Sequence, residues 1–186
     1  MPIVPVESSD ELPITLSEAR IQCMLDADLT DEDSLVQSLI FAAVDYCEQY
    51  TRRPLVLQKK KYVGGFDSCI ELLPNLLSVE SVAYVGDSGE ELTLSVDQYY
   101  VDTASIVGNV SSVGSWPSVK KNHRQPVEVV FSCGYGGVDA VPETIKQCIR
   151  FLVGHWFRNR DAVGSVSGEL QRTVDGLLLF YKVHNV

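Results

Sequence analysis

A cysteine and a histidine, Cys148 and His155, are the residues of this chain best suited to nucleophilic chemistry. A histidine activates a cysteine thiol only from within hydrogen-bond distance. Both lie near one face of a predicted helix, but their separation by about two turns places them roughly 10 Å apart along its axis. We therefore expect no catalytic pair here, and we predict that His155 flanks the core.

Two further features of the sequence are similar to catalytic or ligand-binding groups. Asp97 and Asp102 flank a predicted strand, where aspartate commonly accepts hydrogen bonds from turn amides. The glycine-rich segment 134–137 follows a strand, as a phosphate-binding loop does, but it lacks the lysine and the spacing of a P-loop. We interpret both as tight turns. Since the chain also contains no GxSxG, GxGxxG or HExxH motif, we predict no catalytic residues and no enzyme activity.

The cysteines and histidines do not form a metal-binding pattern. Five cysteines are scattered along the chain without a CxxC pair, and three histidines add no ligand spacing. We predict small buried cysteines in a reducing compartment, with no metal and no cofactor. The alternative from another class is an acidic intracellular enzyme with an unrecognised site, which a covalent probe at Cys69 or Cys133 would reveal.

Composition and charge exclude several classes of function. With 186 residues, 45% of them hydrophobic and 22% charged, the chain matches an ordinary globular protein. Its net charge of −10 argues against binding to a nucleic-acid backbone. No stretch approaches the roughly 20 apolar residues of a membrane span, and the N-terminus shows no signal-peptide pattern, so we expect a cytoplasmic protein without a membrane partner. We interpret the basic run 59–61 as edge-strand charges that block unwanted pairing.

The N-terminal part of the sequence predicts two helices after an extended arm at residues 1–12. Residues 15–18 (TLSE) have the spacing of a capping box, which begins a short helix that ends near Leu25. Residues 30–33 (TDED) repeat this pattern and begin a long helix, 31–52. Apolar residues recur along the long helix at three- and four-residue steps, so one face is predicted to be buried.

From residue 55 to residue 135 the hydrophobic period changes to two, the period of a strand. Apolar residues alternate with others along 127–135. A second strand at 77–85 is followed by a turn and a return strand. Short strands joined by Gly, Asp and Ser turns predict an antiparallel meander or a small sandwich. We therefore predict a β-lobe, 55–135, inserted between helices.

A third helix is predicted at 142–160, where a proline occupies the first turn and apolar residues form a regular stripe. A short polar connector, 161–168, separates it from a short C-terminal helix. The predicted fold class is α+β. It is a small helical bundle (long helix 31–52, helix 142–160, short N- and C-terminal helices) with an inserted antiparallel β-lobe. The whole chain, 1–186, is predicted to be a single domain.

Several large apolar residues remain after these stripes are assigned. Phe41 and Tyr46 lie off the main stripe of the long helix, and Leu179 and Phe180 lie off the stripe of the C-terminal segment. One interpretation is a core that is buried on two sides. The other is a docking surface, because contiguous exposed apolar patches usually mark interfaces. Both interpretations fit the sequence.

The order of these parts resembles that of the head-tail connector (adaptor) proteins of tailed phages and gene transfer agents. The resemblance extends over nearly the whole chain, and the ordered set of segments is more specific than any one of them. A departure is the Gly-Ser run before residue 170. The segments are LPITLSEAR (12–20), TDED (30–33), YTRRPL (50–55), LSVESVAY (77–84), YYVD (99–102), SWP (115–117), GYG (134–136), VPETIKQ (141–147), HWFRNRD (155–161) and VDGLLLFYK (174–182).

This resemblance implies a structural virion protein. Such a subunit docks on the portal protein as a ring, typically of twelve copies, extends the DNA channel and provides the attachment surface for the stopper or tail-completion protein. It is made in the host cytoplasm and is located at the head-tail junction of the virion. The sequence leaves open whether the isolated subunit is a monomer that forms the ring only on the portal. The alternative is another particle component, such as a stopper or tail-completion protein.

The resemblance also implies which residues contact partners. In such proteins the C-terminal part docks on the portal, which assigns Leu177, Leu179, Phe180 and Tyr181 to that contact. The full set of candidates for the portal or neighbour interface is Phe41, Tyr46, Leu177, Leu179, Phe180 and Tyr181.

The acidic charge suggests how DNA passes through such a ring without specific binding. Carboxylates that line a channel repel phosphates within a Debye length of about 8 Å. An acidic helix start that faces solvent is the alternative interpretation. The candidates for the channel or its rim are the residues of the densest acidic segment, Asp26, Asp28, Asp31, Glu32 and Asp33.

Overall fold

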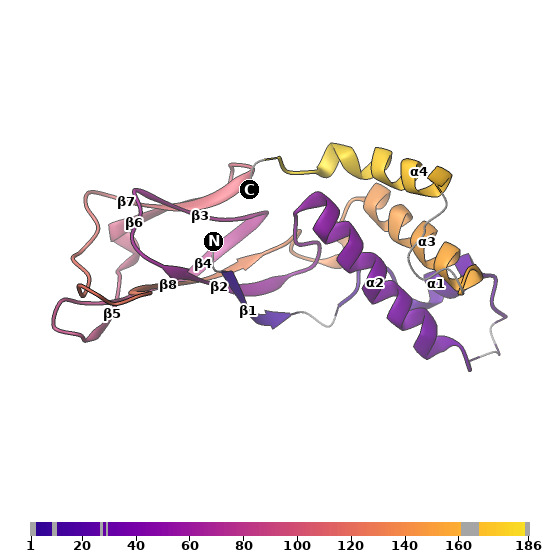
Figure 1. The fold of residues 1–186 in the computed structure, drawn as a ribbon, viewed down its shortest axis with the longest axis horizontal. Coiled ribbons are helices and arrows are strands. Elements are labelled where there is room, and N and C mark those ends of the chain that lie inside the picture. Colours follow the sequence, from indigo (N-terminus) through magenta and orange to yellow (C-terminus); the bar gives the residue numbers. More distant parts are fainter. Residues whose placement is uncertain (1–2, 9–10, 27, 29, 161–167, 185–186) are drawn as a thin grey trace. The chain divides into compact units, whose positions relative to one another are not determined.

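The computed structural model describes residues 3–8, 11–26, 28, 30–160 and 168–184 (Figure 1). The chain forms two compact units. The β unit consists of Met1–Ser9 and Leu57–Gly136, and the helical unit consists of Asp10–Val56 and Gly137–Val186. The β unit therefore includes the N-terminal arm as well as nearly all of the predicted lobe. That the whole chain behaves as a single domain stays a prediction.

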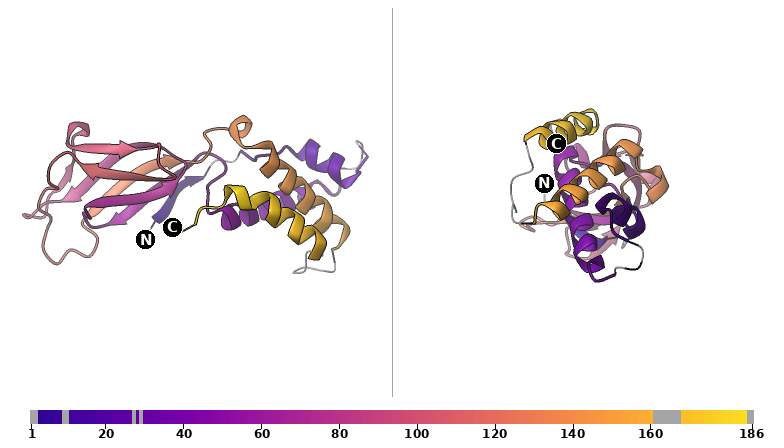
Figure 2. Two further views of the ribbon diagram at one scale, coloured as in Figure 1. Left: turned by 90° about the horizontal axis from the view of Figure 1, so that it is seen from above. Right: turned by 90° about the vertical axis from the view of Figure 1, so that its right-hand side faces the viewer.

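The helical unit contains α1 (Leu16–Cys23), α2 (Asp33–Thr51), α3 (Glu143–Arg158) and α4 (Gly168–Leu178). These are the four helices predicted, with α2 and α3 each a few residues shorter at their ends. A 3₁₀ turn, η2 (Val138–Ala140), precedes α3, and another, η3 (Leu179–Tyr181), follows α4. Figure 2 shows α4 lying alongside α3 and α2, which it contacts. Within the described residues, no helix is both long and apolar enough to cross a bilayer.

The capping box predicted at the start of α1 is confirmed. The Glu18 N–H donates to Thr15 Oγ1 over 3.2 Å, and the Thr15 N–H donates to Glu18 Oε2 over 2.7 Å. The second capping box, predicted at residues 30–33, is wrong. The residue that precedes α2 is Glu32, and no side chain caps the helix start. The helix begins after Glu32 and not after Thr30, so the Asp33 N–H donates to the Thr30 carbonyl over 3.1 Å, and the Asp33 carboxylate pairs with Arg20 at 2.6 Å.

The core of the helical unit is formed by the predicted stripes of α2 and α3. Full burial of a valine, leucine or isoleucine side chain contributes about 1.5–3 kcal/mol to folding. Val174 and Leu178 of α4 are also fully buried, so α4 is part of the same core. The fully buried apolar side chains of α2 and α3 are Val36, Ile40, Ala43, Cys47, Ile145, Cys148, Ile149, Leu152 and Val153.

The β unit is a small antiparallel sandwich, as predicted. One sheet has the order β1-β2-β8-β4-β5, and the other has the order β3-β7-β6, with every described pairing antiparallel. Their inner faces share one apolar core, which includes Phe131 and Ile70. The strands are β1 (Ile3–Ser8), β2 (Gln58–Gly64), β3 (Cys69–Pro74), β4 (Leu76–Val85), β5 (Glu91–Thr93), β6 (Tyr99–Asp102), β7 (Val107–Ser112) and β8 (Val127–Cys133), with the 3₁₀ turn η1 (Val96–Gln98) before β6.

The basic run 59–61 does not lie on an edge strand, so that interpretation is wrong. Residues of the N-terminal arm form β1 and pair with β2, which therefore lies between β1 and β8. The lysines instead take part in cross-strand ion pairs. Lys59 pairs with Glu80 at 2.6 Å, and Lys61 pairs with Glu128 at 3.1 Å.

Candidate docking surface

The C-terminal helix α4 is attached to α2 by a polar network. The Tyr46 hydroxyl donates to Asp175 Oδ1 over 2.9 Å, and Gln171 Nε2 donates to the same oxygen over 2.8 Å. The Tyr50 hydroxyl donates to the Asp175 carbonyl over 3.2 Å. Burial is the main reason that the pKa of Tyr46 rises to about 12, so this phenol stays protonated as a donor. Tyr46 is half-buried and bonded within the helical unit.

The residues after α4 are also fixed to the end of α2. The Val183 N–H donates to the Thr51 carbonyl over 2.9 Å, and Val183 is 3% exposed. Arg53 Nε donates to the Tyr181 carbonyl over 2.7 Å, and the Lys182 ammonium lies 4.8 Å from the centre of the Tyr50 ring. The C-terminal segment is therefore part of the folded helical unit rather than a loosely tethered tail.

This attachment leaves two apolar side chains of η3 directed outward. Phe180 is 89% exposed and Leu179 is 51% exposed, whereas Leu177 and Tyr181 are half-buried. The expectation that Leu179 and Phe180 lie off the buried stripe is confirmed. We call Leu179 and Phe180 the C-terminal knob.

A second apolar feature of the helical unit was not predicted from the sequence. A hollow of about 240 Å³ lies between the start of α1 and the side of α2, and we call it the α1–α2 hollow. Phe41, which follows Ile40 of the lining, is 51% exposed. The sequence signal that could have indicated this hollow is the group of apolar residues around the capping box, Leu12, Ile14 and Leu16. The hollow is lined by Leu12, Ile14, Thr15, Leu16, Gln37 and Ile40.

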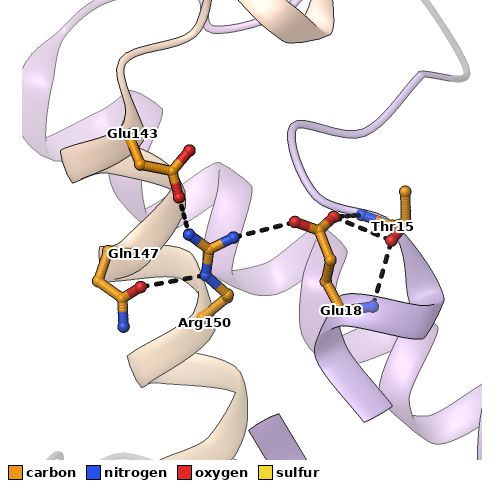
Figure 3. A network of polar contacts seen from close by, with 5 residues as sticks. All are labelled: Thr15, Glu18, Glu143, Gln147 and Arg150. Atoms are coloured by element: carbon orange, nitrogen blue, oxygen red, sulfur yellow. Dashed lines mark hydrogen bonds and ion pairs between the residues drawn. The ribbon is translucent and has the colours of Figure 1, made fainter. Parts of the chain in front are cut away.

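An ion-pair network fixes α1, and with it one wall of the hollow, against α3 (Figure 3). Arg150 Nη1 lies 3.0 Å from Glu18 Oε1, and its Nη2 contacts Glu143 Oε1. Arg150 Nε donates to Gln147 Oε1 over 3.2 Å. The backbone hydrogen bond from Thr15 and the nearby Arg150 charge lower the pKa of Glu18, so its carboxylate stays ionised.

The five acidic candidates for the channel or its rim divide into two groups. Asp26, Asp28 and Asp31 are exposed. Glu32 and Asp33 are half-buried and paired within the helical unit, Glu32 with Arg160 at 3.0 Å and Asp33 with Arg20 at 2.6 Å. Asp26, Asp28 and Asp31 are therefore the exposed members of this set, and their place at a channel or rim stays a prediction.

The cysteine candidates for chemistry do not have the surroundings of nucleophiles. Cys148 is fully buried, and burial raises the pKa of its thiol to about 11. Cys69 is exposed, but partial burial and the nearby Glu71 and Asp102 carboxylates also raise its pKa. Because the thiolate is the reactive form, both cysteines are weak nucleophiles at neutral pH. No cluster suited to a metal ion occurs among the residues that the structure describes.

The remaining candidates for chemistry are turns, as interpreted from the sequence. Asp102 Oδ1 accepts hydrogen bonds from the N–H groups of Ala104 and Ser105, at 2.9 and 3.0 Å. Gly134 and Gly136 have φ values of 120° and 95°, which favour glycine. The predicted connector 161–168 lies, apart from Gly168, outside the described residues.

Comparisons with known proteins relate this chain to a family of phage connectors and to chains of gene transfer agent particles. Residues 13–89 match the model of a family described as phage gp6-like head-tail connector protein. The same fold occurs in the neck of an empty gene transfer agent (GTA) particle computed with C6 symmetry, with a TM-score of 0.83 and 20% identity. It also occurs in the virion of a native GTA particle (0.81, 18%) and in the neck of a native GTA particle computed with C12 symmetry (0.75, 17%). Each match covers 100% of this chain and 97% of the other. A comparison with curated proteins gives no match.

These findings confirm two predictions made from the sequence. The family match over residues 13–89 confirms the resemblance to head-tail connector proteins. The likeness to the particle chains confirms the α+β fold. Together they support a structural connector role.

Proposed function

We propose that this chain is a head-tail connector subunit that forms a ring on the portal protein, extends the DNA channel and provides the surface for the stopper or tail. The observation that supports it most is the match of residues 13–89 to the connector family. The neck and virion sources of the structural relatives agree with a ring at the head-tail junction. A ring with twelve subunits agrees with the C12 symmetry of one of these necks.

In this proposal the subunit works by binding partners, and it catalyses no reaction. The C-terminal knob and Phe41 supply apolar area for the portal or for neighbouring copies, since exposed apolar residues at an interface exclude water when a partner covers them. The exposed carboxylates of Asp26, Asp28 and Asp31 face the DNA path, where they keep the phosphates from binding. The subunit is made in the host cytoplasm and joins the virion during assembly.

The proposal is tested by co-sedimentation of the full chain with portal rings from the same phage. We expect the chain to sediment with the portal, and electron microscopy of the pellet to show an added ring. A chain that sediments only with tail-tube or stopper assemblies would instead identify another tail-end component. A chain that associates with none of these would refute the proposal.

Point substitution is a sharper probe of the contact than truncation. Deleting residues 173–186 would remove Val174, Leu178 and Val183, which are buried, and would therefore disturb the helical core. Phe180→Ser changes a side chain that is 89% exposed. It should weaken ring formation on the portal without lowering the melting temperature. Ile106→Ser, at a residue of the β unit that is 65% exposed, is the matched control.

A further inference from the structure

The C-terminal knob and the α1–α2 hollow lie on opposite flanks of α2. Successive helical residues are turned by about 100°, so Gln37 and Phe41 lie roughly 60–100° to one side of the buried Ile40. Tyr46 and Tyr50 lie roughly 80–120° to its other side. The contacts agree with this geometry, because Gln37 lines the hollow whereas Tyr46 and Tyr50 hold α4. The helical unit thus has an apolar projection on one flank and an apolar recess on the other.

The projection and the recess are both apolar. The hollow is an open depression of about 240 Å³ with a mainly aliphatic lining. Phe180 presents an aromatic ring with 89% of its surface uncovered, and an apolar depression can cover one face of such a ring.

Charges beside the two features have opposite signs. Arg53 and Lys182 adjoin the C-terminal knob, where they contact Tyr181 and Tyr50. Glu11 precedes the first residue of the hollow, and Asp45 lies one turn after Phe41 on α2; both are exposed. Opposite charges around two apolar patches favour their association and fix its orientation.

We propose that the C-terminal knob of one copy inserts into the α1–α2 hollow of the next copy. This inference rests on the proposed function. It departs from the portal contact that the resemblance implies for Leu179 and Phe180, and it names the partner of Phe180 as a second copy of this chain. The contact joins two different patches of the same protein, so it is a head-to-tail contact. Such a contact repeats from copy to copy and closes into a ring when the rotation between copies allows it. Phe41, at the edge of the hollow, covers the inserted ring.

The direct test places a photocrosslinking residue at position 180. Phe180 is replaced by p-benzoylphenylalanine in the full chain, rings are assembled on the portal and irradiated, and the linked peptides are identified by mass spectrometry. We expect links from position 180 to residues 12–16 or 37–41 of a second copy. Links to the portal alone, or an intact ring with no links between copies, would overturn the inference and leave the proposed function standing. Failure to join the portal at all would refute both.

A second test changes the hollow rather than the knob. Gln37→Trp places a large side chain at the hollow, so it should reduce self-association as strongly as Phe180→Ala does, measured as the yield of copy-to-copy crosslinks in rings assembled on the portal. Truncation of a central interface residue typically weakens binding by about tenfold or more. Ile21→Ala, which alters a residue of α1 that is 75% exposed, should leave self-association unchanged. Equal self-association of all three variants would contradict the inference.

Discussion

Replacing Tyr46 with phenylalanine tests whether the polar network holds α4, and therefore the C-terminal knob, in place. The substitution removes the hydrogen bond of 2.9 Å to Asp175 Oδ1 and the contact with Gln171. A hydrogen bond to a charged group contributes about 1.5–3 kcal/mol to stability. Gln171 still donates to Asp175 over 2.8 Å in the variant. We therefore expect the lower part of the range, a loss of about 1.5–2 kcal/mol.

The assay is urea unfolding of the full chain, followed by circular dichroism at helix wavelengths. Tyr100→Phe is the matched control, because Tyr100 is 64% exposed on β6 and its hydroxyl forms no described hydrogen bond. Surface changes of this kind usually alter the free energy of unfolding by less than about 0.5 kcal/mol. If Tyr46→Phe changed stability no more than Tyr100→Phe does, the network would not hold α4 and the reasoning would fail.

The same variant has a distinct dependence on pH. The folded protein raises the pKa of Tyr46 from its ordinary value of 10.0 to about 12. A raised pKa means that the folded state retains the proton longer, so this stabilisation is complete below pH 10 and is lost as the pH rises from about 10 to about 12. The stability difference between the wild type and Tyr46→Phe should therefore shrink over that interval. A difference that grew with pH would contradict the assigned sign.

Three further predictions concern other parts of the helical and β units. Arg150→Met breaks the ion pair with Glu18 that joins α1 to α3 and the pair with Glu143 within α3, and it should cost about 1–3 kcal/mol by urea unfolding. Arg172→Met, at an exposed residue of α4, should cost almost nothing. In the native chain a maleimide should label Cys69 and no other cysteine, because Cys69 is exposed and the other four are buried. Rapid labelling of a second thiol would contradict the burial of that cysteine in the folded protein. Reversing two exposed carboxylates, Asp28→Lys with Asp31→Lys, should slow DNA ejection from the particle without lowering the melting temperature; unchanged ejection would remove these residues from the DNA path.

The features that depend on local sequence were predicted correctly. The capping box at the start of α1 involves residues three apart, and the buried stripe of α3 follows from the helical period alone. The prediction that Leu179 and Phe180 lie off the buried stripe followed in the same way, whereas the sequence left open whether they are exposed or covered by a second side of the core. In each case the residues that decide the structure are close together in the chain.

The features that depend on distant residues were not predictable in this way. The basic run 59–61 looked like an edge strand, because nothing near it in sequence shows that residues 3–8 pair with it. The start of α2 lacks its expected cap because the helix begins after Glu32, and the Asp33 carboxylate pairs with Arg20, which is 13 residues earlier in the chain. The α1–α2 hollow exists only when α1 and α2 meet, so a sequence pattern could indicate surplus apolar residues but not their arrangement around a recess.

The most direct test of the account is cryo-electron microscopy of the full chain bound to portal rings of the same phage. We expect an added ring of this chain on the portal, with Phe180 in the α1–α2 hollow of the neighbouring copy. A portal without added density would contradict the proposed function, and a ring in which Phe180 faces solvent or only the portal would contradict the contact between copies.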